Sequence, residues 1–585
     1  MENKLDIDDK KDIDINFNNN FKLPIYYNEK KMVLNNNIVT DLELKNTINN
    51  SCVPIYNHYF KINNKLTREL LEQISSYYTY DVNYLKENQL LLKSYNKVDN
   101  KYENYSPNYE NIINIWKEIK NDTGFKDKYY YVDWTMWEFL NKSESFLQIM
   151  SIFNMGSPII SLLLPIIILI IPFFVIKMKG LNLSMNEYIQ ILKIIISNHA
   201  LGKLFTEFNN VEVQQKIYLL ISAAFYIFSI YQNILTCIRF NSNMIKIHNY
   251  LNEVKIYLNY TIKSMDNYLL YANNFESQQP FCKILNDKKN ILIEYKNKLE
   301  LISEYKFNAK KIFEIGYVLK NFYELYDNKI YEDAFLYSFG FNGYIDCIEG
   351  LLDNIKEGKI NFTEIINKKN YKKNNKNIFK NSYYAALIND KHVKNTINLD
   401  KNIIITGPNA SGKTTILKSC LINIIFTQQF GCGFYESSKL YPYKFIHCYL
   451  NIPDTSGRDS LFQAEARRCK DIIDIINNNK KDTHFCGFDE LYSGTNPEEA
   501  EISATAFMKY LIKNKNISSI LTTHFIKVCQ KLNDSKNIIN LHMDSEKMDK
   551  KIKYNYKLKE GISNVKGGIN ILHEMNYPKE IIDKL

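Results

Sequence analysis

The sequence lacks the cysteine patterns that build metal sites or disulfide scaffolds. Its ten cysteines are scattered from Cys52 to Cys529, with no CxxC pair and no Cys/His cluster at zinc-ligand spacing. This distribution indicates reduced thiols in a reducing compartment and no cysteine-based metal centre. The Asn- and Asp-rich beginning of the chain has neither the basic start nor the apolar stretch of a secretion signal. We therefore expect an intracellular protein.

A strong excess of one charge is also missing. The formal net charge is +10 over 585 residues, and basic and acidic residues alternate nearly everywhere. This balance permits a nucleic-acid partner without indicating one. With 45% hydrophobic and 24% charged residues, the composition is typical of folded protein. Because a chain of this length exceeds one compact core, we expect three or four structural units.

Two segments in the middle of the chain carry no charge. Residues 157–176, SPIISLLLPIIILIIPFFVI, are long enough to cross a bilayer core as a helix. Residues 217–238, between Lys216 and Arg239, are more diluted by polar side chains. Both segments predict membrane-spanning helices that form a hairpin within residues 151–240, with both termini on one side. Two buried helices of a soluble core are the alternative.

The regions on either side of this hairpin have helical periodicity. After an irregular polar start, residues 1–50, the spacing of apolar residues predicts a helical N-terminal domain over 51–150. Residues 241–366 predict long helices, which suit a lever or clamp but equally an ordinary helical bundle. Residues 367–380 are basic and polar and predict a solvated linker.

A phosphate-binding motif begins at Asn402. The run NIIIT predicts a buried parallel strand, and it leads directly into the loop GPNASGKTT and an apolar helix. This order of strand, glycine loop and helix is the context that a Walker A motif requires. Lys413 would lie beside the β- and γ-phosphates, and the Thr414 hydroxyl would bind Mg²⁺. The whole loop is expected to bind ATP: Gly407, Pro408, Asn409, Ala410, Ser411, Gly412, Lys413, Thr414 and Thr415.

Two further strand ends supply hydrolytic groups. HFCGFDE ends in adjacent carboxylates, of which Asp489 is expected to hold Mg²⁺ and Glu490 to deprotonate the attacking water. SSILTTH places His524 at the end of another predicted strand, where its imidazole can contact that water or the γ-phosphate. The predicted catalytic groups are therefore Lys413, Glu490 and His524.

These motifs resemble those of the MutS family. TGPNASGKTT is similar to the family's TGPN-x-x-GK-[ST]-T loop, FDELYSGT to its DE-x-x-x-GT segment, and LTTHF to its Thr-His switch. The closing residues YKLKEGISNVKGGINILHEMNYPKEII also fit, so the resemblance covers roughly the last 200 residues. It implies an ABC-type α/β P-loop ATPase domain over 381–585, working as a homodimer with ATP and Mg²⁺. His392 takes the approximate place of the adenine-stacking aromatic.

The sequence departs from the family pattern in two places. The signature loop reads TSGRDSLFQAE, with one extra residue before the glutamate, so either Ser456 or Ser460 would reach the partner subunit's ATP. Mismatch-repair members also carry an N-terminal α/β domain with a Phe-x-Glu wedge, and no such domain is evident in this sequence. DNA binding is therefore implied by the family resemblance alone.

Together these patterns predict an α+β multidomain protein: helical N-terminal and lever regions, a transmembrane hairpin and a C-terminal ATPase domain. The expected function is a membrane-anchored MutS-like ATPase whose dimer closure drives a clamp-like motion, with the ATPase domain on the cytosolic side. The alternative is a soluble mismatch-repair protein that binds mismatched DNA and buries the apolar segments. The ATPase half of a transporter is disfavoured because no LSGGQ-type signature is present.

Overall fold

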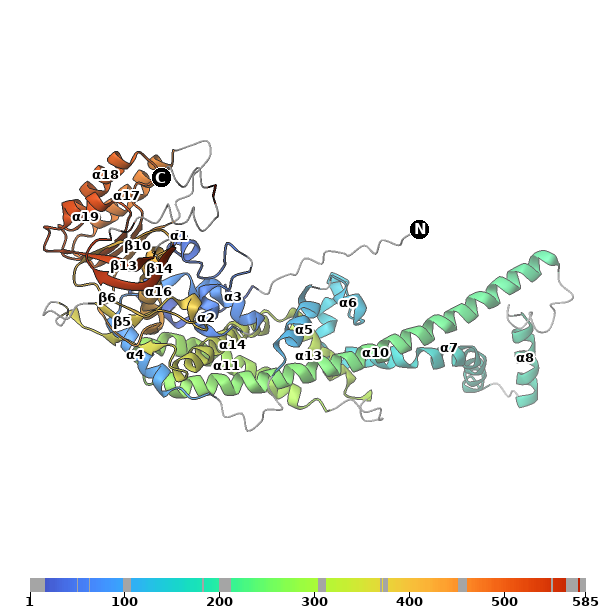
Figure 1. Cartoon of the computed structure of the whole chain (residues 1–585). Helices are drawn as coiled ribbons and strands as arrows, with labels where there is room; N and C mark the ends of the chain where they lie inside the picture. The colour runs from blue at the N-terminus through green and yellow to red at the C-terminus, as the bar shows by residue number, and fades with distance from the viewer. Residues whose placement is uncertain are drawn as a thin grey trace. The chain divides into compact units, whose positions relative to one another are not determined.

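The computed structural model describes most of the chain as two compact units, one of mixed α/β structure and one helical. The first unit combines residues 1–101, 263–289 and 336–585, and the second combines 102–262 and 290–335. Three of the four boundaries fall inside long helices, which Figure 1 labels α10 (Val213–Ala272), α11 (Gln279–Glu300) and α14 (Lys329–Lys356). The described residues are 16–49, 51–62, 64–97, 107–121, 123–180, 184–198, 212–303, 312–368, 371, 377–450, 460–548, 551–563, 565 and 577–578.

The N-terminal part of the first unit is folded from residue 16 onward. Where the polar composition predicts irregular chain, the apolar minority, including Phe17, Phe21 and Leu42, is fully buried and holds short elements in place. Residues 1–15 lie outside the described part. The elements are η1 (Pro24–Tyr27), β1 (Lys31–Val33), α1 (Asn36–Asp41), α2 (Ile55–Phe60), α3 (Lys65–Ile74), β2 (Tyr77–Thr79), α4 (Val82–Ser94) and η4 (Glu276–Gln278).

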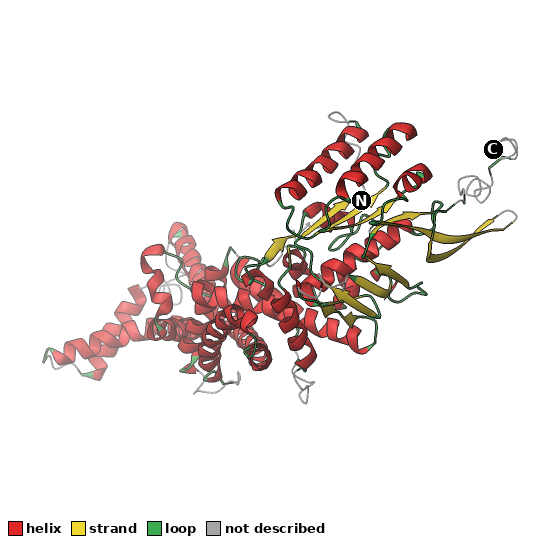
Figure 2. Ribbon diagram, turned by 90° about the vertical axis from the view of Figure 1, so that its left-hand side faces the viewer, coloured by secondary structure: helices red, strands yellow, loops and turns green. Residues whose placement is uncertain are grey.

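A six-stranded sheet in the order β10-β11-β12-β7-β13-β14 forms the centre of the C-terminal part. Its first five strands are parallel, and β14 pairs antiparallel with β13. Figure 2 shows helices on both faces of this sheet. The bounds are β7 (Asn402–Thr406), α16 (Lys413–Phe430), β10 (Phe445–Tyr449), α17 (Leu461–Asn478), β11 (His484–Asp489), α18 (Pro497–Leu511), β12 (Ile517–Thr522), α19 (Ile526–Leu532), β13 (Ile538–Met548) and β14 (Lys551–Glu560).

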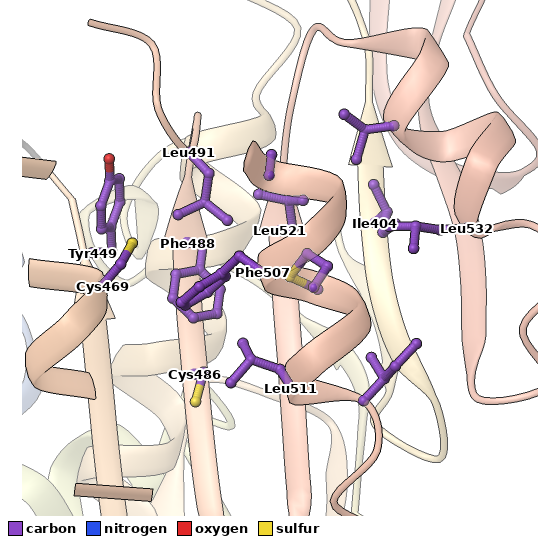
Figure 3. Packing of buried hydrophobic residues seen from close by; sticks show 14 of the residues in the cluster. Ile404, Tyr449, Cys469, Cys486, Phe488, Leu491, Phe507, Leu511, Leu521 and Leu532 are labelled. Atoms are coloured by element: carbon purple, nitrogen blue, oxygen red, sulfur yellow. The ribbon is translucent and has the colours of Figure 1, made fainter. Parts of the chain in front are cut away.

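Side-chain alternation along β11 explains the two helical layers. Cys486 and Phe488 point into the apolar cluster with α17, α18 and α19, where Phe507 and Leu532 are buried (Figure 3). The opposite face receives α16, which approaches Gly487 so closely that an added Cβ would lie 3.0 Å from a methyl carbon of Leu417. Burial on both faces is why these strands read as continuous apolar runs.

Two smaller sheets flank the N-terminal side of this domain. One pairs β3 with β8, and the other has the order β4-β9-β5-β6. Asn395 joins the second small sheet to β14, because its side chain donates to the Tyr556 carbonyl at 2.9 Å and accepts from the Leu558 N–H at 2.9 Å. The bounds are β3 (Asn361–Phe362), β4 (Glu364–Ile365), β5 (Ile378–Ser382), η5 (Ala385–Leu387), β6 (Asn395–Asn398), β8 (Cys432–Gly433) and β9 (Ser437–Leu440).

The second unit is helical. Aromatic side chains dominate its packing; Phe125 stacks on Tyr326 with ring centroids 4.3 Å apart, and Trp116 stacks on Phe335 at 5.3 Å. Its elements, apart from the parts of α10, α11 and α14 that it contains, are α5 (Tyr109–Asn121), α6 (Phe125–Lys128), η3 (Thr135–Lys142), α7 (Glu144–Met178), α8 (Met185–Asn198) and α13 (Ile315–Asp327).

The two uncharged segments lie in α7 and α10, which run antiparallel within the second unit (Figure 1). The Tyr226 hydroxyl donates to the Ser161 carbonyl at 3.2 Å, and the Cys237 thiol contacts the Met155 carbonyl at 3.3 Å. By length and composition, two helical stretches could span a membrane, Glu144–Leu163 and Lys216–Ala272, and only 22% and 6% of their apolar windows are buried. These values identify apolar helices and do not establish a membrane hairpin.

Candidate nucleotide-binding site

The site lies where the strand order of the six-stranded sheet reverses. From β7 the chain proceeds to β10 at one edge, whereas β13, reached from β12, pairs on the other side of β7. In parallel sheets, such a switch point leaves a crevice at the carboxyl ends of the strands. The predicted loop follows β7 at this crevice, and Asp489 and His524 come from the ends of the neighbouring strands β11 and β12.

The glycine loop holds Lys413 at the N-terminus of α16. Lys413 is 6% exposed, and its ammonium donates to the Gly407 and Pro408 carbonyls at 3.2 Å each. Burial lowers the pKa of Lys413, while the charges of Glu490 and Asp489 oppose that shift. Gly412 ends the loop in a left-handed conformation with φ 95°. A cation inside a loop at a helix N-terminus is an arrangement suited to phosphate.

Asp489 is fixed by two threonine hydroxyls. The Thr414 hydroxyl donates to Asp489 Oδ2 at 2.8 Å, and the Thr522 hydroxyl donates to Oδ1. The first bond places a hydroxyl oxygen and a carboxylate oxygen side by side, and Thr414 lines a cavity that lies beside the loop. Hard cations such as Mg²⁺ prefer such oxygen ligands, usually with waters and phosphates completing the shell. No group of three or more His, Cys, Asp or Glu side chains fit for a metal occurs among the described residues.

Glu490 and His524 form a hydrogen-bonded pair. His524 Nε2 lies 2.8 Å from Glu490 Oε1 and also 3.1 Å from Lys413 Nζ. The hydrogen bond from His524 holds the pKa of Glu490 below its ordinary value, against the opposing effect of burial. One ring nitrogen cannot accept from the ammonium and donate to the carboxylate at the same time, so the two contacts belong to different protonation states of the ring. Glu490 adopts φ 51°, a left-handed conformation that is uncommon for residues other than glycine.

A cavity of about 490 Å³ opens beside the loop. His392 lines it and stacks on Tyr383 with ring centroids 4.0 Å apart at 12°. His392 Nδ1 lies 3.0 and 2.9 Å from the Leu387 and Asp390 carbonyls, so Nδ1 carries the proton. Sequence reasoning missed several residues that also line the cavity, because they belong to no recognisable motif. Among them are Tyr383, Tyr384, Met543 and Tyr556.

The remaining loop residues divide between cavity lining and loop structure. Asn409, Ala410 and Thr415 line the cavity, and Ala410 adopts φ 62°. Ser411 is 1% exposed, and its hydroxyl has no hydrogen-bond partner within the described residues. The size of the cavity, the Thr414–Asp489 oxygen pair and this unpaired hydroxyl all fit a phosphate-bearing ligand with a divalent cation.

The signature segment is only partly described. Ser456 lies outside the described residues. Ser460 caps α17 in a reciprocal pair: its hydroxyl accepts from the Gln463 N–H at 3.3 Å, and its own N–H donates to the Gln463 side chain at 3.0 Å. The choice between the two serines stays open.

A buried carboxylate joins α17 to the loop that follows Glu490. Glu465 is 2% exposed and accepts from the Ser493 hydroxyl and the Gly494 N–H, both at 3.1 Å. Gly494 fits directly against the first turn of α17, since an added Cβ would lie 2.6 Å from Leu461 Cγ. The glutamate of the signature segment is therefore in direct contact with the segment that resembles the family's DE-x-x-x-GT pattern.

Comparisons with known proteins match this C-terminal region. The family profile of MutS domain V matches residues 403–585. The DNA mismatch repair protein MutS of Prochlorococcus marinus is 30% identical over 223 residues, which cover 36% of this chain and 24% of that protein. Those of Persephonella marina and Listeria monocytogenes are 26% identical over 196 and 199 residues, 33% of this chain and 22% of each relative. The match thus spans less than a quarter of each relative, and it supports MutS family membership for the C-terminal third of this chain, residues 403–585.

Proposed function

We propose that the C-terminal domain is an ABC-type P-loop ATPase that binds ATP with Mg²⁺ and hydrolyses it. The observation that carries this proposal is the convergence of Lys413, Thr414, Asp489, Glu490 and His524 at the carboxyl ends of three adjacent parallel strands. The match of residues 403–585 to MutS domain V supports it, since the MutS resemblance of these motifs implies an ATPase. Each group has the chemistry that phosphoryl transfer to water needs.

The proposed roles follow from the contacts of each side chain. The loop N–H groups and Lys413 would bind the phosphates. Thr414 and Asp489 would hold Mg²⁺, which would supply positive charge beside the phosphate oxygens. Glu490 accepts the proton of the attacking water, and its lowered pKa keeps it ionised for that task. His392 and Tyr383 offer aromatic faces to the adenine.

His524 has a positioning role in this proposal. A phosphate beside Lys413 would attract the ammonium and leave His524 Nε2 free to donate to Glu490, the shorter of its two contacts. That donation fixes the carboxylate toward the water. Binding of nucleotide would in this way select one of the two protonation states of the ring.

ATP turnover by Lys413→Ala and Glu490→Gln tests the assignment, with Lys509→Ala and Glu498→Gln as surface controls. Lys413→Ala should abolish nucleotide binding or turnover, and Glu490→Gln should bind ATP but hydrolyse it at least 100-fold more slowly, within the range that single catalytic groups supply. Wild-type turnover by Glu490→Gln would show that the base is wrongly assigned.

We further propose that two subunits close around ATP and drive a clamp-like motion. The proposal rests on the family resemblance of the signature segment and on the Glu465 contact that joins it to Gly494. Glu490→Gln with ATP should sediment as a homodimer, and the same variant without nucleotide as a lighter species. A strictly monomeric profile with ATP would exclude closure.

A role in DNA mismatch repair is the second candidate, and the curated relatives favour it over a membrane role because they carry that name. In this role the chain would bind mismatched duplex and the apolar helices would be covered by protein. Affinities for mismatched and matched duplex, each measured over a salt series, test it. A preference below tenfold would count against mismatch recognition.

Anchoring of the chain in a membrane, with the ATPase domain in the cytosol, is a separate proposal. It rests on the exposed apolar side chains of α7 and α10, for example Ile159, Phe174, Phe225 and Phe228. Carbonate washing of membranes from expressing cells should leave an anchored chain in the pellet. Complete release into the supernatant would favour the soluble mismatch-repair protein.

A further inference from the structure

A second cavity lies at the opposite end of the six-stranded sheet, where its parallel strands begin. It measures about 530 Å³ and is lined by residues at or just before the starts of β7, β10, β11, β12 and β13, such as Asn402, Lys444, Thr483, Ile517 and Asn537. Because these strands are parallel, their amino ends all lie at the same end of the sheet. The nucleotide-binding site lies at the carboxyl ends of the same strands. Since a strand rises about 3.3 Å per residue, the length of a five- or six-residue strand, roughly 16–20 Å, separates the two ends. A ligand there would be distinct from the ATP.

The lining of this cavity is basic. Five lysines from five separate segments line it, against two aspartates, Asp400 and Asp482. One lysine, Lys444, is paired with Asp482 at 2.9 Å. The other four are exposed, and in the described part of the chain none of them has an ion-pair partner: Lys368, Lys401, Lys481 and Lys515.

Some of these lysines offset the partial negative charge at helix C-termini, but this explains only part of the positive charge at the cavity. α17 ends at Asn478 and α18 at Leu511, so Lys481 and Lys515 follow helix C-termini, each of which carries roughly half a negative charge. Lys401 has no such explanation, because it lies in the turn between β6 and β7, where no helix ends. An excess of positive charge therefore remains at the cavity.

Tyrosine rings are interleaved with the lysines. Tyr371 and Tyr441 stack with ring centroids 4.8 Å apart, and the Lys444 ammonium lies over the Tyr80 ring, 5.6 Å from its centroid. All three rings line the cavity and are only partly buried. A second hollow of about 390 Å³ shares Asn514, Lys515 and Ile517 with the first and adds Lys480, Lys513 and Tyr510. Lysines and tyrosines thus continue from one hollow into the next.

We propose that this end of the sheet, at the amino ends of its parallel strands, binds a single-stranded nucleic acid. Phosphates would lie on the exposed lysines and unpaired bases against the tyrosines, the combination with which proteins hold single strands without reading sequence. The two adjoining hollows favour a polymer over a free nucleotide. The tyrosine faces favour a single strand over a duplex, whose bases are already stacked. The inference does not depend on ATP hydrolysis.

Fluorescence anisotropy of a labelled 20-residue oligothymidylate with the full chain tests the proposal, in saturating ADP and Mg²⁺ so that the first cavity is filled. Lys401→Glu/Lys515→Glu should weaken binding about tenfold or more. It should also reduce the slope of log affinity against log salt by about 1.4, since each phosphate contact on a single strand contributes about 0.7. Lys380→Glu/Lys553→Glu, which carries the same charge change outside both hollows, should bind as the wild type does.

Tyr441→Leu separates stacking from charge, because it should weaken binding while leaving the salt slope unchanged. An equal loss of oligothymidylate affinity in the two double variants would overturn the proposal. A lowered melting temperature with unchanged affinity in Lys401→Glu/Lys515→Glu would overturn it as well. Unlabelled duplex or inorganic polyphosphate that competes as well as the single strand would also overturn it. If the double variant fails to fold, photocrosslinking of the wild type to an iodouracil-substituted strand decides: crosslinks at Tyr80, Tyr371, Tyr441 or Tyr510 support the site, and crosslinks only elsewhere refute it.

Discussion

Removal of the Glu465 carboxylate should loosen the loop that follows Glu490. In Glu465→Ala, both donors to this carboxylate lose their acceptor. Ser493 is exposed, so its hydroxyl can bond to water instead. The Gly494 N–H is shielded by the first turn of α17, so its bond accounts for most of the effect.

The size of the effect follows from that one bond. Hydrogen bonds to charged groups stabilise proteins by about 1.5–3 kcal/mol, and about 1.36 kcal/mol corresponds to a factor of ten. Amide hydrogen exchange in peptides covering residues 491–499 should therefore quicken roughly 10- to 150-fold in Glu465→Ala. Exchange in peptides from α3, far along the chain, should not change.

Glu465→Gln is the matched control. Its amide oxygen can still accept from Gly494, and its amide N–H can donate to the Ser493 oxygen, so exchange should quicken less than tenfold. ATP turnover should fall in the order wild type, Glu465→Gln, Glu465→Ala, because the loop begins next to Glu490. If the amide exchange rate of peptides covering residues 491–499 in Glu465→Ala lay within threefold of the wild-type rate, the idea that this carboxylate holds the loop would be refuted.

Three further variants probe the nucleotide-binding site. His524→Ala removes the hydrogen bond that lowers the pKa of Glu490, so this pKa should rise and the acid limb of the pH–turnover profile should move to higher pH; an unmoved limb would contradict the pairing. His392→Ala should weaken binding of a fluorescent ATP analogue about 2- to 10-fold, the range of one aromatic contact, without changing the binding of free triphosphate. Gly412→Ala introduces a Cβ 3.3 Å from Tyr556 at φ 95° and should lower ATP affinity, whereas Gly358→Ala, at φ 69° in open space, should affect stability alone.

The chemistry of the nucleotide-binding site could be predicted from the sequence because it lies in local motifs. A buried strand ending in a glycine loop fixes where Lys413 and Thr414 lie, and strand ends at Asp489 and His524 must meet at one edge of a parallel sheet. Tyr383, Met543 and Tyr556 could not be predicted in this way, since only the pairing of β13 with β7 and the packing of the small sheet bring them to the cavity. The basic cavity was missed for the same reason, as its five lysines come from segments that are far apart in the sequence.

Helix α16 shows why the sequence could not predict that N-terminal elements pack against the C-terminal domain. Fifteen of its eighteen residues are buried, so it has no polar face from which its neighbours could be inferred. At its end, Gln428 donates to the Thr79 carbonyl at 3.0 Å, and Gln429 donates to the Ile74 and Tyr77 carbonyls at 2.7 and 2.9 Å.

These amides are buried, and leaving them unpaired would cost about 1–3 kcal/mol each, so they fix the N-terminal elements to the helix. The same helix begins at Lys413. One continuous helix therefore joins the phosphate loop to the contacts that hold residues 74–79.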